Sequence, residues 1–160
     1  MLIPITVHVP ERLVPDFYVR FGEFMSQGPQ SAPSAPKVLE SGALAPAWVD
    51  SDEAEQIALA LWEEVSGPGH SVLIYLSRAT DKEPRRFRPD EVATALQHPK
   101  GASGIAGILG GVGKAIRRAD LPIYNTPRGG TWHYVWDWDG EEYTMTPEVA
   151  RLLRKAERHR

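Results

Sequence analysis

The sequence predicts an α+β fold, a winged helix-turn-helix core with an N-terminal strand-helix appendage. Between residues 85 and 118 it shows a short helical pattern, a turn, and a longer helix with one apolar and one polar side. A segment of alternating aromatic residues follows, and its two-residue turn, Asp139-Gly140, predicts a β-hairpin. Helix, turn, helix and then hairpin is the element order of a winged helix.

Basic residues are concentrated in the same region. Residues 1–66 carry three Lys/Arg and ten Asp/Glu, residues 67–118 carry nine and four, and residues 119–160 carry six and seven, within a net charge of −3. Charges farther apart than about 10 Å are largely screened at physiological salt, so a partner responds to the local charge. We therefore expect a polyanion to be attracted to 67–118 although the chain as a whole is weakly acidic.

Composition excludes several classes of protein. A chain of 160 residues suits one domain, or a small domain with an appendage. It contains no cysteine, which excludes disulfides, thiolate zinc sites and cysteine catalysis. The first residues lack the pattern of a signal peptide, and no apolar run approaches the roughly 20 residues that span a bilayer. We expect a cytoplasmic protein that does not contact membranes.

The N-terminal third predicts an appendage and a linker. Residues 3–9 alternate apolar and polar side chains, as in a half-buried strand, and an apolar stripe predicts a helix over 11–25. Residues 26–47 are rich in Pro, Ser, Ala and Gly and are expected to form a linker. The predicted division is therefore a strand-helix appendage over 1–25, the linker, and a winged-helix domain over 48–160.

The appendage is too small to fold alone, so it is a possible dimerisation element, and we expect a homodimer. A strand followed by a helix also suggests a ribbon-helix-helix protein. In this chain, however, the proline-rich segment occupies the place of the second helix of that fold.

Four helical patterns precede the hairpin. Asp52 and Glu55 have the spacing of a capping box, and an apolar stripe continues to Val65. Gly67-Pro68-Gly69 is expected to end this helix, a second helix is expected over 69–79, and a polar loop over 80–86. Pro89 suits the first position of a third helix, and a turn over 97–101 leads to a fourth, expected over 102–119.

The fourth helix has two unlike sides at 100° per residue. Its apolar side consists of Ile105, Ile108, Leu109, Val112 and Ile116. Its opposite side consists of Ser103, Gly107, Gly110, Lys114 and Arg118. Each glycine in a helix interior costs about 1 kcal/mol relative to alanine, but the apolar stripe runs on across the glycines and favours a helix.

The last third predicts strands and a closing helix. Residues 132–138 alternate, and with 141–145 they are expected to form a hairpin within 122–145. A turn over 126–130 carries Arg128. Thr146 and Pro147 suit the cap and the first position of the final helix.

These elements predict a sequence-specific DNA-binding protein, a transcriptional regulator with double-stranded DNA as its partner. The helix near 102–119 would enter the major groove and the hairpin near 122–145 would act as the wing. Lysine and arginine neutralise phosphates, and small or hydroxyl side chains allow close approach or donate to a phosphate or base edge. The candidate contacts are Arg85, Arg86, Arg88, Lys100, Ser103, Lys114, Arg117, Arg118, Arg128 and Thr131.

Other interpretations of the basic side remain open. The basic side of the helix would also suit a face that is simply solvated. It would equally suit an adaptor that docks an acidic protein partner. The acidic first 66 residues of the chain could themselves cover this side. The tryptophans near 132–138 suit core packing, a dimer surface or base stacking.

Catalytic and cofactor motifs are incomplete. The phosphate-loop pattern around Gly113-Lys114 fails because position 108 is Ile and position 115 is Ala. The five histidines lack metal-ligand spacing, and the hairpin carboxylates suit a turn. We therefore expect no enzyme, no cofactor and no metal.

Four segments carry a resemblance to a known family. They are 5–11 with Phe17-Tyr18, the stretch 86–93, the stretch 104–109, and the terminal 145–150. On these segments the chain resembles an uncharacterised family of short winged-helix-like proteins found in actinobacteria. The resemblance implies a winged-helix fold and a possible DNA-binding regulator, and it carries no assigned catalytic residue.

Overall fold

The computed structural model describes residues 9–14, 16–19, 21, 35–127 and 129–159. The chain divides into two compact units, Met1–Pro33 and Ser34–Arg160. In the first unit, the 3-10 helix η1 (Glu11–Leu13) is followed by helical backbone at 14, 16–19 and 21, where a helix is predicted. The predicted strand over 3–9 lies outside the described residues except for Val9, which is not in a strand.

The second unit opens with a hairpin where a linker is predicted. Strand β1 (Lys37–Val38) pairs antiparallel with β2 (Leu44–Ala45), and η2 (Ala47–Asp50) follows. Ala45 has no exposed surface, and Trp48 and Val49 in η2 are buried. The prediction of a linker over 26–47 is therefore wrong from residue 37 onward. The Pro/Ser-rich stretch that suggested it ends at Pro36, and the residues after it pair and pack.

The five helices predicted for the second unit are present. They are α2 (Ala54–Glu64), α3 (Gly67–Ala79), α4 (Pro89–Ala95), α5 (Gly101–Arg118) and α6 (Pro147–Arg158). Gly67-Pro68-Gly69 begins α3 instead of ending α2, with Pro68 in the first turn, where a missing amide donor costs nothing. The capping box is also wrong, because the N-cap of α2 is Glu53 and makes no side-chain cap bond; Glu55 pairs with Lys155 of α6.

A three-stranded antiparallel sheet joins distant parts of the chain. Its order is β3-β7-β6, formed by β3 (Arg85–Phe87), β7 (Tyr143–Met145) and β6 (Asp137–Trp138). Arg85 lies opposite Met145, and Trp138 lies opposite Tyr143. The expected polar loop over 80–86 therefore contains the start of strand β3. This strand lies between α3 and α4 in the sequence, and its pairing with β7 holds the β6–β7 hairpin beside them.

The predicted continuous strand over 132–138 is wrong. Strand β5 (Thr131–Trp132) pairs with β4 (Tyr124–Asn125) and ends, and residues 133–136 form a buried loop before β6. Tyr134 adopts a φ of 52°, which a strand does not allow. The Trp132 indole donates to the carbonyl of Trp136 at 2.7 Å and closes the loop. Alternation in the sequence therefore does not correspond to alternation in burial here.

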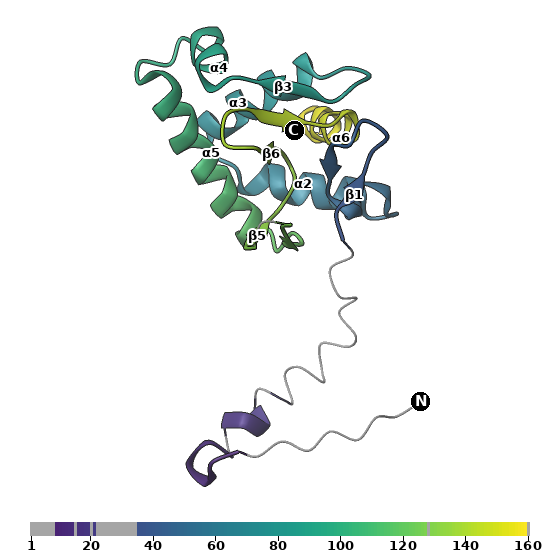
Figure 1. Cartoon of the computed structure of the whole chain (residues 1–160), viewed down its shortest axis with the longest axis vertical. Helices are drawn as coiled ribbons and strands as arrows, with labels where there is room; N and C mark the ends of the chain where they lie inside the picture. The colour runs from purple at the N-terminus through teal and green to yellow at the C-terminus, as the bar shows by residue number, and fades with distance from the viewer. Residues whose placement is uncertain (1–8, 15, 20, 22–34, 128, 160) are drawn as a thin grey trace. The chain divides into compact units, whose positions relative to one another are not determined.

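The core forms where α5 meets α3 and α4, and where α6 packs on α2 and α3. Ile105 and Ile116 of α5 have no exposed surface, and burial of such a side chain stabilises by about 1.5–3 kcal/mol. With Leu109 and Val112 also buried, this outweighs about 1 kcal/mol for each exposed glycine of α5. The fold is thus α+β, and Figure 1 shows α5 running along one side of this unit with the β5 and β6 segments beside it.

Candidate binding site beside α5

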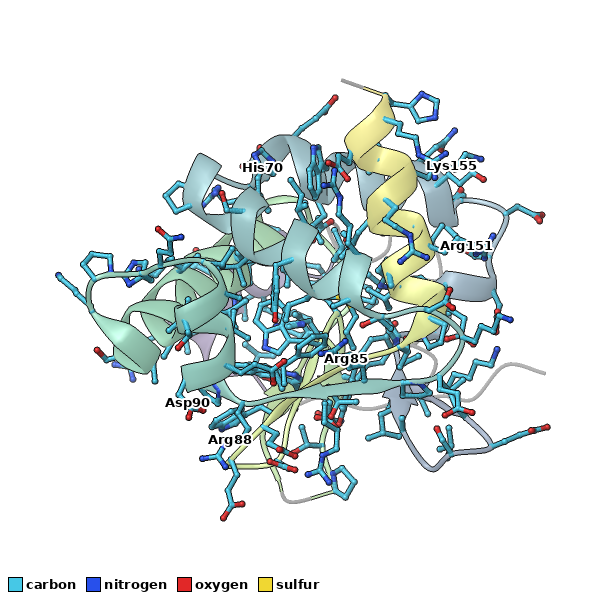
Figure 2. The ribbon with its side chains drawn as sticks, turned by 90° about the horizontal axis from the view of Figure 1, so that it is seen from above. His70, Arg85, Arg88, Asp90, Arg151 and Lys155 are labelled. Atoms are coloured by element: carbon cyan, nitrogen blue, oxygen red, sulfur yellow. The ribbon has the colours of Figure 1, made fainter. Side chains whose placement is uncertain are left out.

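The arginines around α4 are engaged in ion pairs. Arg85 pairs with Glu91 at 3.1 Å, and its guanidinium carbon lies 5.1 Å from the ring centroid of Phe87. Arg88 pairs with Asp90 at 3.3 Å, and Figure 2 shows these two side chains next to each other. Both arginines remain partly exposed, so a stronger anion could compete for them.

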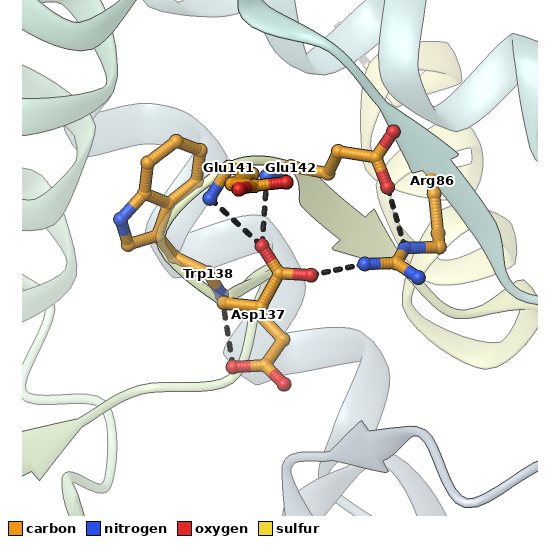
Figure 3. A network of polar contacts seen from close by, with 6 residues as sticks. Arg86, Asp137, Trp138, Glu141 and Glu142 are labelled. Atoms are coloured by element: carbon orange, nitrogen blue, oxygen red, sulfur yellow. Dashed lines mark hydrogen bonds and ion pairs between the residues drawn. The ribbon is translucent and has the colours of Figure 1, made fainter.

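Arg86 is held more firmly, by the hairpin itself (Figure 3). It pairs with Asp139 and, at 2.7 Å, with Glu142. Asp139 also accepts the backbone amides of Glu142 and Glu141, at 2.8 and 2.9 Å. These amide bonds, together with Arg86, lower the pKa of the Asp139 carboxyl. The tip of the predicted wing is therefore acidic, and Arg86 serves to anchor it to β3.

The cations of α5 do not share one face. Arg118 turns back to α2, where it contacts the carboxylate of Glu64 at 2.7 Å and the carbonyl of Glu64 at 2.8 Å. Lys100 and Ser103 lie near the start of α5 and line a depression on another side of the helix. Lys114 and Arg117 are exposed near its end. Within the described residues, neither Lys114 nor Arg117 has an ion-pair partner.

A cleft of about 560 Å³ separates the end of α5 from the segment 131–143. The α5 wall is formed by small, apolar and cationic residues: Ala106, Leu109, Gly110, Gly113, Lys114 and Arg117. The opposite wall is mainly aromatic: Thr131, Trp132, His133, Trp136, Trp138 and Tyr143. Of the candidate contacts, the cleft therefore brings together Lys114, Arg117 and Thr131. Arg128 lies outside the described residues.

The glycines of α5 differ in what surrounds them. A Cβ at Gly104 would lie 2.1 Å from the ring of His98, so packing requires glycine there. A Cβ at Gly107, Gly110, Gly111 or Gly113 would meet nothing within 4 Å. Packing inside the described unit does not explain these four glycines. Gly110 and Gly113 leave the helix backbone open along the cleft, whereas Gly107 and Gly111 line the depression near Lys100.

His133 is the most unusual polar group of the cleft. It is 4% exposed and lies between Trp132 and Trp136, each with its ring centroid 4.3 Å away. Its Nδ1 accepts the amide of Val135 at 3.0 Å, so the neutral ring carries its proton on Nε2. Within the described residues Nε2 has no hydrogen-bond partner. Burial, with a smaller contribution from the charge of Arg117, lowers the pKa of His133 to about 3.

Sequence reasoning missed this histidine because it searched for metal-ligand spacing. The sequence contains two separate signals: His133 stands between two nearby tryptophans, and an earlier helix contains repeated glycines. Neither feature has a meaning alone; the fold brings them together.

In the described part of the chain, no group of three or more His, Cys, Asp or Glu side chains is placed to hold a metal ion. Among the described helices, none has the length and apolarity needed to cross a bilayer.

Comparison with family models, with curated proteins and with solved structures gives no match for this chain.

Proposed function

We propose that the protein is a cytoplasmic DNA-binding protein with a winged helix-turn-helix core, a transcriptional regulator that inserts α5 into the major groove. The observation that carries the proposal is the position of β3. It lies between α3 and α4 and pairs with β7, so the β6–β7 hairpin is anchored beside the α4–turn–α5 unit. A hairpin held next to a helix-turn-helix is the defining arrangement of a winged helix, and the resemblance to the actinobacterial family points the same way.

The set of expected DNA contacts is smaller than the sequence suggests. Lys100, Lys114 and Arg117 are the cations of α5 and its cap without an ion-pair partner among the described residues, and Ser103 is exposed near the helix start. Three phosphate contacts correspond to a slope of about −2.7 in log K against log salt for each protomer. The acidic hairpin tip would be repelled by phosphate, so it acts as a support of α5.

A homodimer is part of the proposal. In the first unit, Tyr18 and Val19 are 66% and 62% exposed, and Phe21 is 46% exposed. Apolar side chains this exposed on so small a unit favour association with a second copy. Two copies would double the number of phosphate contacts.

The test is binding to a mixed-sequence duplex, followed by fluorescence anisotropy from about 50 to about 200 mM salt. Lys114→Gln with Arg117→Gln should lower the affinity and reduce the salt slope by about 2 per protomer. The matched control is Arg151→Gln with Arg158→Gln, which removes the same charge from α6 and should leave the slope unchanged. Figure 2 shows Arg151 on α6, on the opposite side of the view from Arg88, which lies beside the start of α4.

Two outcomes would contradict the proposal. One is the absence of duplex binding at low salt. The other is an equal loss from the α5 and α6 variants, which would mean that only net charge matters. Selection of bound fragments from genomic DNA then tests sequence specificity.

A protein-interaction adaptor is the second candidate, favoured by the composition of α5. Residues 102–113 contain no charged side chain and only one hydroxyl, so this part of the helix has little with which to identify a base pair. On this hypothesis Lys114 and Arg117 dock an acidic protein partner. Recovery of a stoichiometric protein without nucleic acid in a pull-down would favour it over DNA binding.

A further inference from the structure

We propose that the cleft between α5 and the segment 131–143 binds a small aromatic anion, an aromatic ring system that carries one carboxylate or sulfonate group. The proposal goes beyond DNA binding and does not depend on it. The cleft has a volume of about 560 Å³, which falls in the range of small-molecule sites, roughly 300–1,000 Å³. Such sites are mostly apolar with a few polar groups, as this cleft is.

The two walls suit a flat ring. Trp132, Trp136 and Trp138 line one side and offer faces and edges for aromatic contact. On the other side Gly110 and Gly113 present bare helix backbone, since a Cβ at either position would point into open space. A ring can therefore lie against the aromatic wall and reach the helix backbone at Gly110 and Gly113.

The polar groups of the cleft select an anion. Lys114 and Arg117 line it and have no ion-pair partner among the described residues, so both are available for an acidic group. The planar guanidinium of Arg117 matches the two oxygens of a carboxylate. No Asp or Glu lines this cleft among the described residues.

His133 is the independent observation that points to an occupant. Its side chain is more than nine-tenths buried in the aromatic wall, and its Nε2–H donor is unsatisfied within the described residues. Buried donors are nearly always paired, because an unpaired one is unfavourable. Nε2 is covered by its neighbours, so contact with a ligand acceptor requires an adjacent side chain to change rotamer, as side chains at interfaces commonly do on binding.

The test uses the full chain and 1-anilinonaphthalene-8-sulfonate, an aromatic anion whose fluorescence rises in an apolar site. We expect saturation at one equivalent per chain. Gly110→Leu places a side chain in the cleft and should weaken binding at least about tenfold. The control, Gly111→Leu, has the same substitution on the same helix, lines the other depression and should change binding less than about twofold. Leucine is a better helix former than glycine, so both variants should fold.

A second pair of probes tests the charge. Lys114→Gln with Arg117→Gln should weaken binding of the sulfonate about tenfold, as expected for lost charge-assisted hydrogen bonds. The same variant should bind the neutral analogue N-phenyl-1-naphthylamine nearly as well as the unmodified chain does. The ¹⁵N signal of His133 Nε2 should shift on addition of the sulfonate.

The proposal is overturned if the dye binds at several equivalents, if it does not bind, or if Gly110→Leu and Gly111→Leu weaken it equally. It is also overturned if the charge variant affects both probes alike, or if the His133 signal does not move. None of these assays contains DNA, so failure here is distinct from failure of duplex binding.

Discussion

The buried, neutral state of His133 predicts a specific loss of stability in mild acid. Its pKa is lowered from 6.5 to about 3, so between these values the unfolded chain binds a proton that the folded chain does not. The contribution is complete above about pH 6.5 and is lost as the pH falls. Each pH unit corresponds to 1.36 kcal/mol, which gives about 1.5–2 kcal/mol between about pH 6.5 and about pH 5, and about 4–5 kcal/mol by pH 3.

The window from about pH 6.5 to about pH 5 separates this effect from that of the carboxylates. Glu55 and Asp139 also have lowered pKa values, the first through its hydrogen bond to Lys155 and the second through backbone amides. Their effect has the same sign but begins only below about pH 5. Protonated His133 would in addition face the positive charge of Arg117, which resists charging of the ring.

The assay is denaturant unfolding at several pH values in this window, for the unmodified chain and for His133→Asn. Asparagine can still accept the amide of Val135 but has no proton to gain. The variant should be less stable at neutral pH, yet it should lose about 1.5–2 kcal/mol less on acidification to about pH 5. Parallel losses in the two proteins, or imidazole NMR signals of His133 that titrate near pH 6.5, would refute the reasoning.

Four further substitutions test the packing, the backbone strain and the ion pairs of the fold. Gly69→Ala places a Cβ 2.9 Å from Cγ2 of Val112 and should cost about 1–3 kcal/mol, whereas Gly107→Ala meets no neighbour and should stabilise by about 1 kcal/mol; equal effects on the free energy of unfolding would contradict this. Asp120 has a φ of 55° after the end of α5, a conformation that glycine adopts without strain. Asp120→Gly should therefore raise the free energy of unfolding by about 1 kcal/mol and raise the thermal midpoint. A lower midpoint would argue against strain at this position. Arg86→Gln should lower the free energy of unfolding by less than about 1 kcal/mol, because the Arg86 side chain is 60% exposed. Amide exchange in the β6–β7 hairpin should become faster. Unchanged exchange would mean that the ion pairs do not hold the hairpin.

Helices were predictable from the sequence because their causes are local. The stripe from Ile105 to Ile116 corresponds to the buried side of α5, and proline at the start of α4 and α6 marks their first turns. The same local logic misplaced Gly67-Pro68-Gly69. A Gly/Pro cluster indicates a break, but only the packing of Gly69 against its neighbours shows on which side of the break the next helix begins.

Strand β3 and the 133–136 loop depend on distant contacts. Only Phe87 of β3 is buried, and the partner of Arg85 in the sheet is Met145, so nothing near Arg85 in the sequence indicates a strand. In the loop, four consecutive residues are buried, which hydrophobic alternation cannot represent. Tyr134 has a left-handed backbone, a conformation that bulky residues rarely adopt, so the local sequence does not predict it.

The candidate site was partly predictable, for a related reason. A helical wheel describes one helix in isolation and groups Lys114 with Arg118. In the structure Arg118 reaches Glu64, 54 residues away, and Arg86 reaches Asp139, 53 residues away. Two long side chains that seemed available are therefore used within the fold. Lys114 and Arg117 remain for a partner in the cleft, because no acid lies within reach of them among the described residues. The local sequence does not reveal this.

The two proposals share these cations, and this links them. A phosphate and a small aromatic anion cannot both occupy Lys114 and Arg117, so binding of one must weaken binding of the other by the same factor. The linkage requires no movement of the fold, because an anion bound to Lys114 and Arg117 takes the place of two phosphate contacts, which correspond to about 2 in the salt slope of duplex binding. The glycines on the open side of α5 and the cations at its end suit this exchange, because the same two cations serve both ligands. The cleft would then act as a switch that sets whether the positive end of α5 is available to DNA.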